Sequence, residues 1–157
     1  MAGRHEYAVG LTWTGNTGAG TATYRSYRRT CAVTAAGKPA IAGSADPHFR
    51  GDADRWNPEE LLVAALSQCH LLAFLHAAAQ AGVVVVDYAD AATGTMATEG
   101  DGGHMTGVVL HPVVTVAAAG MAEECARLHE QAHENCFIAN SVNFPVTHEA
   151  AVQVATP

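Results

Sequence analysis

Residues 57–76 read NPEELLVAALSQCHLLAFLH and decide how the rest of the chain is organised. Asn57 is a good helix N-cap, Pro58 suits the first helical position because no N–H is needed there, and the two following glutamates favour the helix dipole. Apolar residues then surround the helix axis instead of forming one stripe. This predicts a long helix covered on most sides by sheet, by another helix or by a second subunit, with Cys69 shielded from bulk water in its middle.

The amino-acid composition and net charge limit the functions that this chain can have. The 157 residues are 49% hydrophobic and 15% charged, which predicts one soluble globular domain over residues 1–157. The net charge of −7 and the lack of a basic run argue against nucleic acid or an anionic membrane surface as a partner. The first residues lack the apolar region of a signal peptide, and we expect the longest apolar run to be too short to span a bilayer. We therefore expect a cytoplasmic protein that acts on a small neutral or apolar substrate.

Four cysteines, at positions 31, 69, 125 and 136, lack the dense spacing of a secreted disulfide framework. In a reducing compartment, a reactive pair is more plausible than structural disulfides. A buried cysteine can also simply pack, since free cysteine is among the most buried residue types. Cys31, on a strand, and Cys125, on the apolar face of a helix, are expected to be such packing residues.

Periodicity predicts the order βββ, helix, ββ, helix, β. The expected strands cover residues 7–13, 24–33, a short segment around 41, 83–88 and beyond, 105–116 and 142–154. A second, amphipathic helix is expected over residues 121–134, and glycines at residues 100–103 mark a hairpin turn. The sequence therefore predicts an α+β fold whose sheets are mainly antiparallel.

Two features of this layout resemble a known family. Asn-Pro-Glu at residues 57–59 ends ten residues before Cys69, and Cys136 follows just beyond the second helix. Over nearly the whole chain this pattern resembles the OsmC/Ohr family of thiol-dependent hydroperoxide reductases. The resemblance implies an OsmC-like fold, with a long central buried helix, in an intertwined homodimer. His70 and Phe137 differ from the common family pattern, which indicates a divergent subgroup.

The resemblance also implies a site. The first cysteine, Cys69, would be peroxidatic, Cys136 would resolve it, and Glu59 and an arginine would complete the site. Arg50, within His48-Phe49-Arg50, is the best candidate for the arginine, and the second strand offers three alternatives, Arg25, Arg28 and Arg29. The implied partners are an organic hydroperoxide and a thiol reductant, such as a lipoyl group or another dithiol; no metal or organic cofactor is needed.

Residue chemistry agrees with these roles. A thiolate attacks the outer oxygen of a hydroperoxide to give a sulfenic acid and an alcohol, and a second thiol then condenses with the sulfenic acid to a disulfide. A guanidinium can stabilise the thiolate and hydrogen-bond the peroxide oxygens, and Glu59 would hold it in place. Glu59 also has a simpler interpretation, as a first-turn carboxylate that favours the helix dipole.

Two rival functions belong to other classes. His129-Glu130-Gln131-Ala132-His133 matches the H-E-x-x-H motif, in which two imidazoles bind zinc and the glutamate acts as general base in hydrolysis. This helix also needs the same face for packing, and the chain offers no convincing third ligand downstream. The other rival is a non-catalytic module that binds a hydrophobic ligand beside the long apolar helix.

Helix geometry predicts that two chains share each active site. Glu59 and Cys69 are ten residues apart, which is about 15 Å along a straight helix at 1.5 Å per residue. Residues 61–68 contain neither glycine nor proline to break that helix. We therefore expect a homodimer in which the glutamate of one chain lies near the cysteine of the other.

Overall fold

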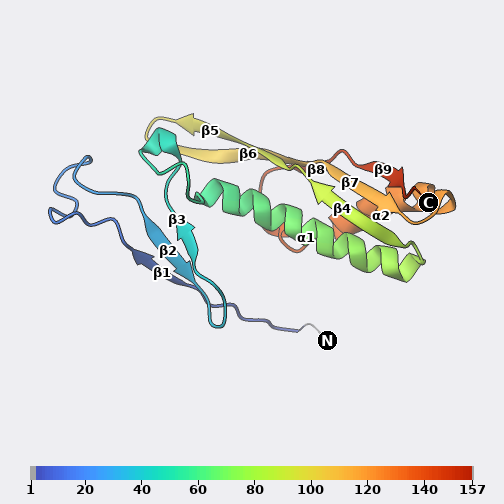
Figure 1. The fold of residues 1–157 in the computed structure, drawn as a ribbon. Helices are drawn as coiled ribbons and strands as arrows, with labels where there is room; N and C mark the ends of the chain where they lie inside the picture. Colours follow the sequence, from blue (N-terminus) through green and yellow to red (C-terminus); the bar gives the residue numbers. More distant parts are fainter. Residues whose placement is uncertain (1–2, 157) are drawn as a thin grey trace. The chain divides into compact units, whose positions relative to one another are not determined.

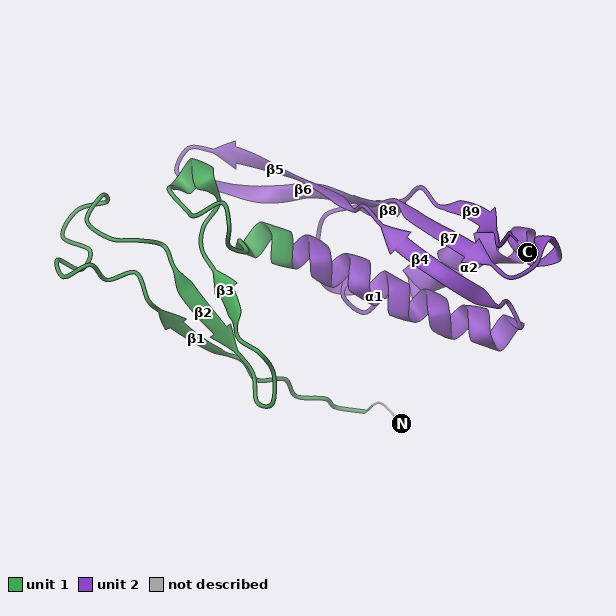
Figure 2. Cartoon of the chain, viewed as in Figure 1, with its two compact units in different colours: residues 1–61 green, residues 62–157 purple. Residues whose placement is uncertain are grey.

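The chain forms two compact units, residues 1–61 and residues 62–157 (Figure 2). The computed structural model describes residues 3–156. Helix α1 (Pro58–Ala81) begins in the first unit and continues through the second. The expectation of one domain over residues 1–157 stays a prediction.

The first unit contains a three-stranded antiparallel sheet in the order β1-β2-β3, which confirms the predicted opening meander (Figure 1). Its strands are β1 (Gly10–Trp13), β2 (Cys31–Thr34) and β3 (Ile41–Gly43), followed by the short helix η1 (Pro47–Phe49). The predicted strand over residues 24–33 is much shorter than expected. The side chain of Asn16 instead accepts the N–H groups of Gly18 and Gly20, which starts a loop before β2.

The second unit contains two three-stranded sheets, ordered β4-β7-β9 and β5-β6-β8. Strands β4 and β7 pair antiparallel, as do β5 and β6, whereas β8 and β9 each join their sheet in parallel. The predicted α+β fold with mainly antiparallel sheets is therefore confirmed. The elements are β4 (Val85–Asp90), β5 (Thr93–Glu99), β6 (Gly102–Leu110), β7 (Pro112–Val116), η2 (Ala119–Met121), α2 (Ala122–Glu134), η3 (Ala139–Ser141), β8 (Val146–His148) and β9 (Ala151–Val154).

Each long predicted strand of the second unit divides into two shorter strands. The expected strand over residues 105–116 breaks at His111, whose N–H donates to a side-chain oxygen of Asp90 at 2.7 Å. The other oxygen of Asp90 accepts the Ser67 hydroxyl of α1. A side chain from another part of the chain thus takes the place of a ladder hydrogen bond, which a local sequence pattern does not reveal.

The start of α1 follows the sequence prediction, and a glycine ends the helix. The Asn57 side chain accepts the N–H of Glu60 at 2.8 Å, and the Glu60 carboxylate accepts the N–H of Asn57 at 3.3 Å. At the other end, Gly82 adopts a left-handed conformation with φ of 72°. The Val83 N–H then donates to the carbonyl of Ala78 at 2.9 Å, which closes the helix.

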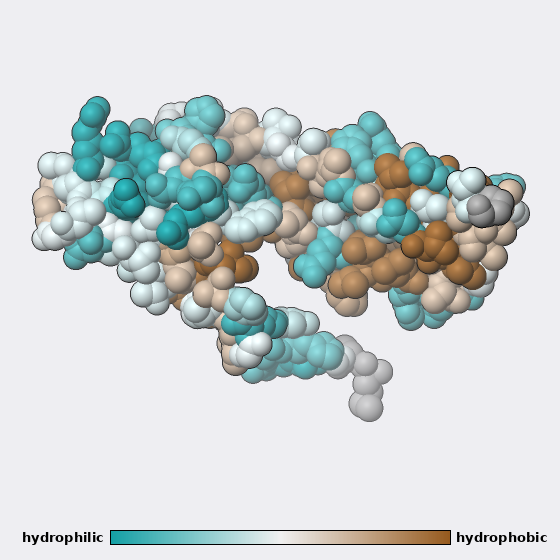
Figure 3. All heavy atoms as spheres, in the orientation of Figure 1, coloured by the Kyte–Doolittle hydropathy of each residue, from teal (hydrophilic) through white to brown (hydrophobic). Residues whose placement is uncertain are grey.

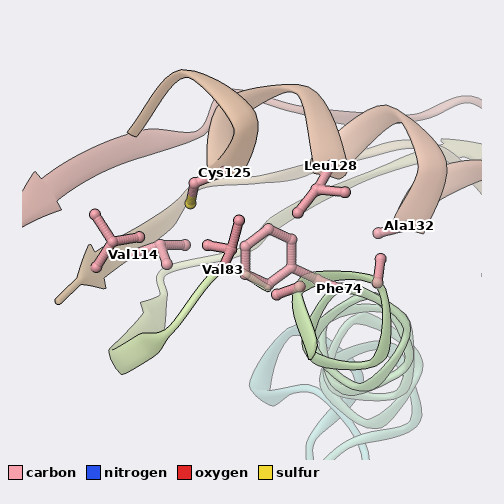
Figure 4. Close-up of a cluster of buried hydrophobic side chains, with 9 residues drawn as sticks. Phe74, Val83, Val114, Cys125, Leu128 and Ala132 are labelled. Carbon is pink, nitrogen blue, oxygen red and sulfur yellow. The ribbon is translucent and has the colours of Figure 1, made fainter. Parts of the chain in front are cut away.

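The main core of the second unit lies between α1, α2 and β7 (Figure 4). Phe74 of α1 is fully buried and points toward Leu128 and Ala132 of α2. Cys125 belongs to the same core, so its predicted packing role is confirmed. A second cluster consists of Leu66, Val108, Leu110 and Val146.

Helix α1 is buried on one side only within this chain. Its buried residues are Leu66, His70, Phe74, Ala77 and Ala78, whereas Leu72 and Leu75 are exposed. Its length and hydropathy are sufficient to cross a membrane, so the expectation that no apolar run is long enough was wrong. A single such helix is weak support for a membrane span, because core helices of soluble proteins meet the same criteria.

Candidate active site

Two free thiols meet in the second unit. Cys69 of α1 is partly exposed, whereas Cys136, just after α2, is buried. The two thiols lie close enough to influence each other. Burial, followed by the interaction with the Cys69 side chain, raises the pKa of the Cys136 thiol to about 11. Cys136 therefore holds its proton at neutral pH.

The packing of the two helices explains why these thiols meet. Phe74 of α1 stacks on His129 of α2, with ring centroids 4.2 Å apart. Cys69 lies five residues before Phe74 in α1, and Cys136 lies seven residues after His129, just beyond α2, so the contact between the helices brings the two thiols near each other. The core thus determines the thiol geometry, although 67 residues separate the two cysteines in the sequence.

A cavity of about 520 Å³ opens beside Cys69 in the second unit. This volume is in the range of small-molecule sites. No Asp, Glu, Lys or Arg lines the cavity among the described residues, and its polar groups are neutral amides and one imidazole. The arrangement suits a neutral organic molecule with an apolar body. The lining residues are Cys69, Leu72, Ala73, His76, Ala77, Gln80, Gln131, Asn135 and Phe137.

Glu59 lines a separate cavity of about 480 Å³ in the first unit. One carboxylate oxygen of Glu59 is buried and accepts no hydrogen bond from residues 3–156. Arg29 lines the same cavity, together with Cys31 and the aromatic residues Trp13, Tyr27 and Phe49. An unpartnered carboxylate oxygen therefore shares a cavity with a guanidinium.

Arg29 is held between two tyrosines. Its guanidinium lies 4.2 Å from the ring centroids of both Tyr24 and Tyr27. It also donates to the backbone carbonyls of Tyr27 at 2.8 Å and Tyr24 at 2.7 Å. Arg29 is one of the three alternatives that the second predicted strand offered, and the tyrosines and arginines clustered over residues 24–29 are typical of such stacking.

Arg50, the arginine favoured by the sequence, does not line the Glu59 cavity, nor do Arg25 and Arg28. It follows η1 in a left-handed conformation with φ of 66°. Its guanidinium lies 6.0 Å from the Tyr24 ring centroid. The role of Arg50 stays a prediction, and the geometry within the first unit favours Arg29.

The H-E-x-x-H segment does not form a zinc site. His129 points into the core, and its Nδ1 lies 3.0 Å from Nε2 of His70. Glu130 instead pairs with His148 at 3.3 Å. Across residues 3–156, no group of three or more His, Cys, Asp or Glu side chains is arranged to hold a metal ion. The geometry of these side chains therefore does not support the zinc-hydrolase alternative.

The His70–His129 pair was missed by sequence reasoning. The exposed fractions of the two residues are 1% and 0%, and their ring planes are within 8° of parallel. The outer nitrogens, Nδ1 of His70 and Nε2 of His129, are buried without a partner among the described residues. The available signal was the spacing of Leu66, His70 and Phe74, which places His70 on the buried face of α1.

Residues 51–150 match the family model of OsmC-like proteins. The chain belongs to the OsmC-like family. An OsmC-like protein of unknown function from Vibrio cholerae is 34% identical, with a TM-score of 0.84 over 94% of this chain and 99% of that one.

More distant solved structures share the OsmC-like fold. An organic hydroperoxide resistance protein OsmC from Legionella pneumophila is 20% identical, with a TM-score of 0.68 over 97% of this chain and 99% of that chain. An organic hydroperoxide resistance protein from Elizabethkingia anophelis is 21% identical, with a TM-score of 0.66 over the same shares of the two chains. A search of curated proteins gives no match.

The buried histidine pair should make the stability of this OsmC-like protein depend on pH. Burial, followed by the charges of neighbouring histidines, lowers the pKa of His70 and of His129 from 6.5 to about 4. Below pH 6.5 the unfolded chain therefore binds more protons than the folded chain, and stability falls until about pH 4. We expect the free energy of unfolding to decrease by roughly 3 kcal/mol between pH 7 and pH 5 because of this pair.

Urea unfolding at the two pH values measures this decrease. The His70→Leu/His129→Leu double variant, which has no proton to gain at these positions, should lose most of the pH dependence. An equal decrease in the wild type and in the double variant would contradict the assignment.

Proposed function

We propose that this OsmC-like protein reduces organic hydroperoxides to alcohols, with Cys69 as the peroxidatic and Cys136 as the resolving cysteine. The observation that carries the proposal is the proximity of two free thiols, one of which, Cys69, lines a cavity without Asp, Glu, Lys or Arg. Family membership and the hydroperoxide resistance proteins among the structural neighbours support a redox role of the peroxidase type at the level of the family.

The chemistry proceeds in three steps. The Cys69 thiolate attacks the outer oxygen of ROOH, the O–O bond breaks, and ROH leaves after its oxygen takes up a proton. The Cys136 sulfur then attacks the Cys69 sulfenic acid, the S–O bond breaks, and the Cys136 proton leaves with the hydroxyl as water. A thiol or dithiol reductant finally restores both thiols. Such a reductant requires a reducing compartment, and we place the protein in the cytoplasm.

The cavity beside Cys69 supports an organic substrate over hydrogen peroxide. A volume of about 520 Å³ is far larger than a peroxide group alone needs. Leu72 and Phe137 offer apolar contacts to a substrate. Because no Asp, Glu, Lys or Arg side chain lines the cavity among the described residues, a charged substrate is disfavoured. The same cavity would serve a protein that only binds a hydrophobic ligand, so thiol chemistry must discriminate the two functions.

Single-cysteine variants test the division of labour. Cys69→Ser should abolish consumption of cumene hydroperoxide, because no thiolate remains beside the cavity. Cys136→Ser should consume one equivalent and then stop at a sulfenic acid, which dimedone labels and mass spectrometry detects. Cys125→Ser, in the core away from this pair, is the matched control and should retain turnover.

Equal multi-turnover activity in the Cys69 and Cys136 variants, under a reductant that cannot resolve a sulfenic acid, would sink the assignment. A protein that only binds hydrophobic ligands would lose no thiol on treatment with the hydroperoxide.

We assign the activating guanidinium to Arg29 in preference to Arg50. Arg29 shares a cavity with Glu59, and its two tyrosines fix the orientation of the planar group. The buried, unpartnered oxygen of Glu59 then has a cationic partner once the site is assembled. Arginine suits this role because it stays charged and presents several N–H donors in one plane.

Lysine substitutions separate the two arginines. Arg29→Lys should slow sulfenic acid formation by about tenfold or more, because lysine keeps the charge but loses the planar, stacked donor group. Stopped-flow measurement in the Cys136→Ser background isolates this step. Arg127→Lys, on the exposed surface of α2, is the control. A slow Arg50→Lys variant beside a normal Arg29→Lys variant would transfer the role to Arg50.

We further propose that two chains share each site. Helix α1 is unbroken from Pro58 to Ala81, so Glu59 and Cys69 lie about 15 Å apart along its axis and cannot both contact one peroxide group. Within one chain, only 28% of the apolar stretch of α1 that is long enough to cross a membrane is buried. Apolar atoms gather on the surface where α1 and β4 lie (Figure 3). Leu72 and Leu75 of α1 and Val86 of β4 are exposed. A second copy of α1 covering this surface would bring Glu59 of one chain to Cys69 of the other.

Mixed dimers test the shared site. Glu59→Ala and Cys69→Ser, each inactive alone, are mixed, unfolded and refolded together. Random pairing gives half heterodimers, each with one intact site of two, and hence about a quarter of wild-type activity. Native mass spectrometry confirms that heterodimers are present. No recovery in such a mixture would mean that each site is built within one chain.

A further inference from the structure

The His70–His129 pair connects the two segments of the chain that contain the thiols. His70 directly follows Cys69, and His129 lies two helical turns before Cys136. The nitrogen atoms that join the two rings are 3.0 Å apart. Each ring therefore belongs to an element that carries or leads to one thiol, and their hydrogen bond joins these two elements, α1 and α2.

This hydrogen bond is a poor way to stabilise a core. A neutral imidazole carries one N–H, so whichever ring donates, the other N–H lies on an outer nitrogen. Both outer nitrogens are buried without a partner in the described part of the chain. Two apolar side chains would fill this space without an unpaired donor. The directional bond instead gives the two helices a defined separation, which apolar packing specifies less sharply.

The surroundings keep both rings in place. Phe74 stacks on His129 with centroids 4.2 Å apart, and the ring of His148 is tilted against both histidines at 5.5 Å and 5.6 Å. The ionisable groups whose charges act on the pair are His133, His148, Glu130 and Asp90. His148 is itself held by Glu130 at 3.3 Å.

We propose that His70 and His129 are positioning residues that hold the Cys69 and Cys136 sulfurs at the separation required for disulfide formation. The inference rests on the proposed function, in which the Cys136 thiol displaces the hydroxyl of the Cys69 sulfenic acid and releases water. A disulfide forms only over a narrow range of backbone separations, about 4.4–6.8 Å between Cα atoms. A small change in helix separation therefore changes how readily the two sulfurs bond.

The reduction potential of the Cys69–Cys136 pair tests this proposal without any hydroperoxide. The potential is measured by equilibration of the full-length protein with dithiothreitol redox buffers, for the wild type, His70→Leu, His129→Leu and the double variant. We expect each of the three variants to weaken disulfide formation by about tenfold, equivalent to a potential about 30 mV less negative. His133→Leu, on the same helix but outside the pair, is the control and should leave the potential unchanged.

Stability measurements separate positioning from a merely structural role. The single variants leave one buried imidazole without its partner, so they should lower the unfolding midpoint, and the double variant should regain part of that loss. The potential should not recover with it. Recovery of the wild-type potential in the double variant would show that packing alone sets the thiol separation and would overturn the proposal. A wild-type potential in all three variants would also overturn it.

The two proposals fail in distinguishable ways. If the protein consumes no hydroperoxide but the potentials shift as expected, the positioning role stands and the proposed substrate does not. If the Cys69 and Cys136 variants behave as expected while the histidine variants keep the wild-type potential, only the positioning role is lost.

Discussion

The packing of α1 against α2 around Phe74 is the contact on which the candidate site depends. Phe74 is fully buried and stacks on His129, and truncating such a residue removes contacts that a core cannot replace. Cys69 and Cys136 each lie within about two helical turns of this contact along the chain, so the approach of Cys69 to Cys136 depends on core geometry rather than on local sequence alone. The proximity of the two thiols is in this sense a property of the hydrophobic core.

The chemistry is divided between two compact units. The second unit holds the thiols and an uncharged cavity, whereas the first holds a carboxylate with a buried, unpartnered oxygen and a guanidinium stacked between tyrosines. An unpartnered carboxylate oxygen is costly to bury, so the arrangement favours an assembled state in which it gains a partner. The exposed apolar surface of α1 gives a physical reason for that assembly, because a second copy would remove this surface from water.

The sequence predicted the features that depend on local rules. Asn57 and Pro58 predicted the start of α1, because capping geometry needs only neighbouring residues. The hairpin at Gly100 was predicted for the same reason, and its φ of 59° confirms the turn. Features that depend on distant residues were not predictable in this way: the strand break at His111 requires Asp90 from another strand.

The residues of the candidate site were also predictable only in part. The family resemblance, confirmed by the family match over residues 51–150, selected Cys69 and Cys136 before their contact was known. It did not select the arginine, because the tyrosines that hold Arg29 act through stacking in three dimensions. The His70–His129 pair was hidden for a similar reason, since each histidine alone resembles an ordinary core residue.

The most direct test of the account is to identify which sulfurs bond after a single turnover. The reduced protein is treated with one equivalent of cumene hydroperoxide, remaining thiols are alkylated, and peptides are mapped by mass spectrometry. We predict one dominant disulfide, between Cys69 and Cys136, with Cys31 and Cys125 alkylated. A disulfide that involves Cys31 or Cys125, or Cys69 oxidised to sulfinic acid with Cys136 still free, would contradict it.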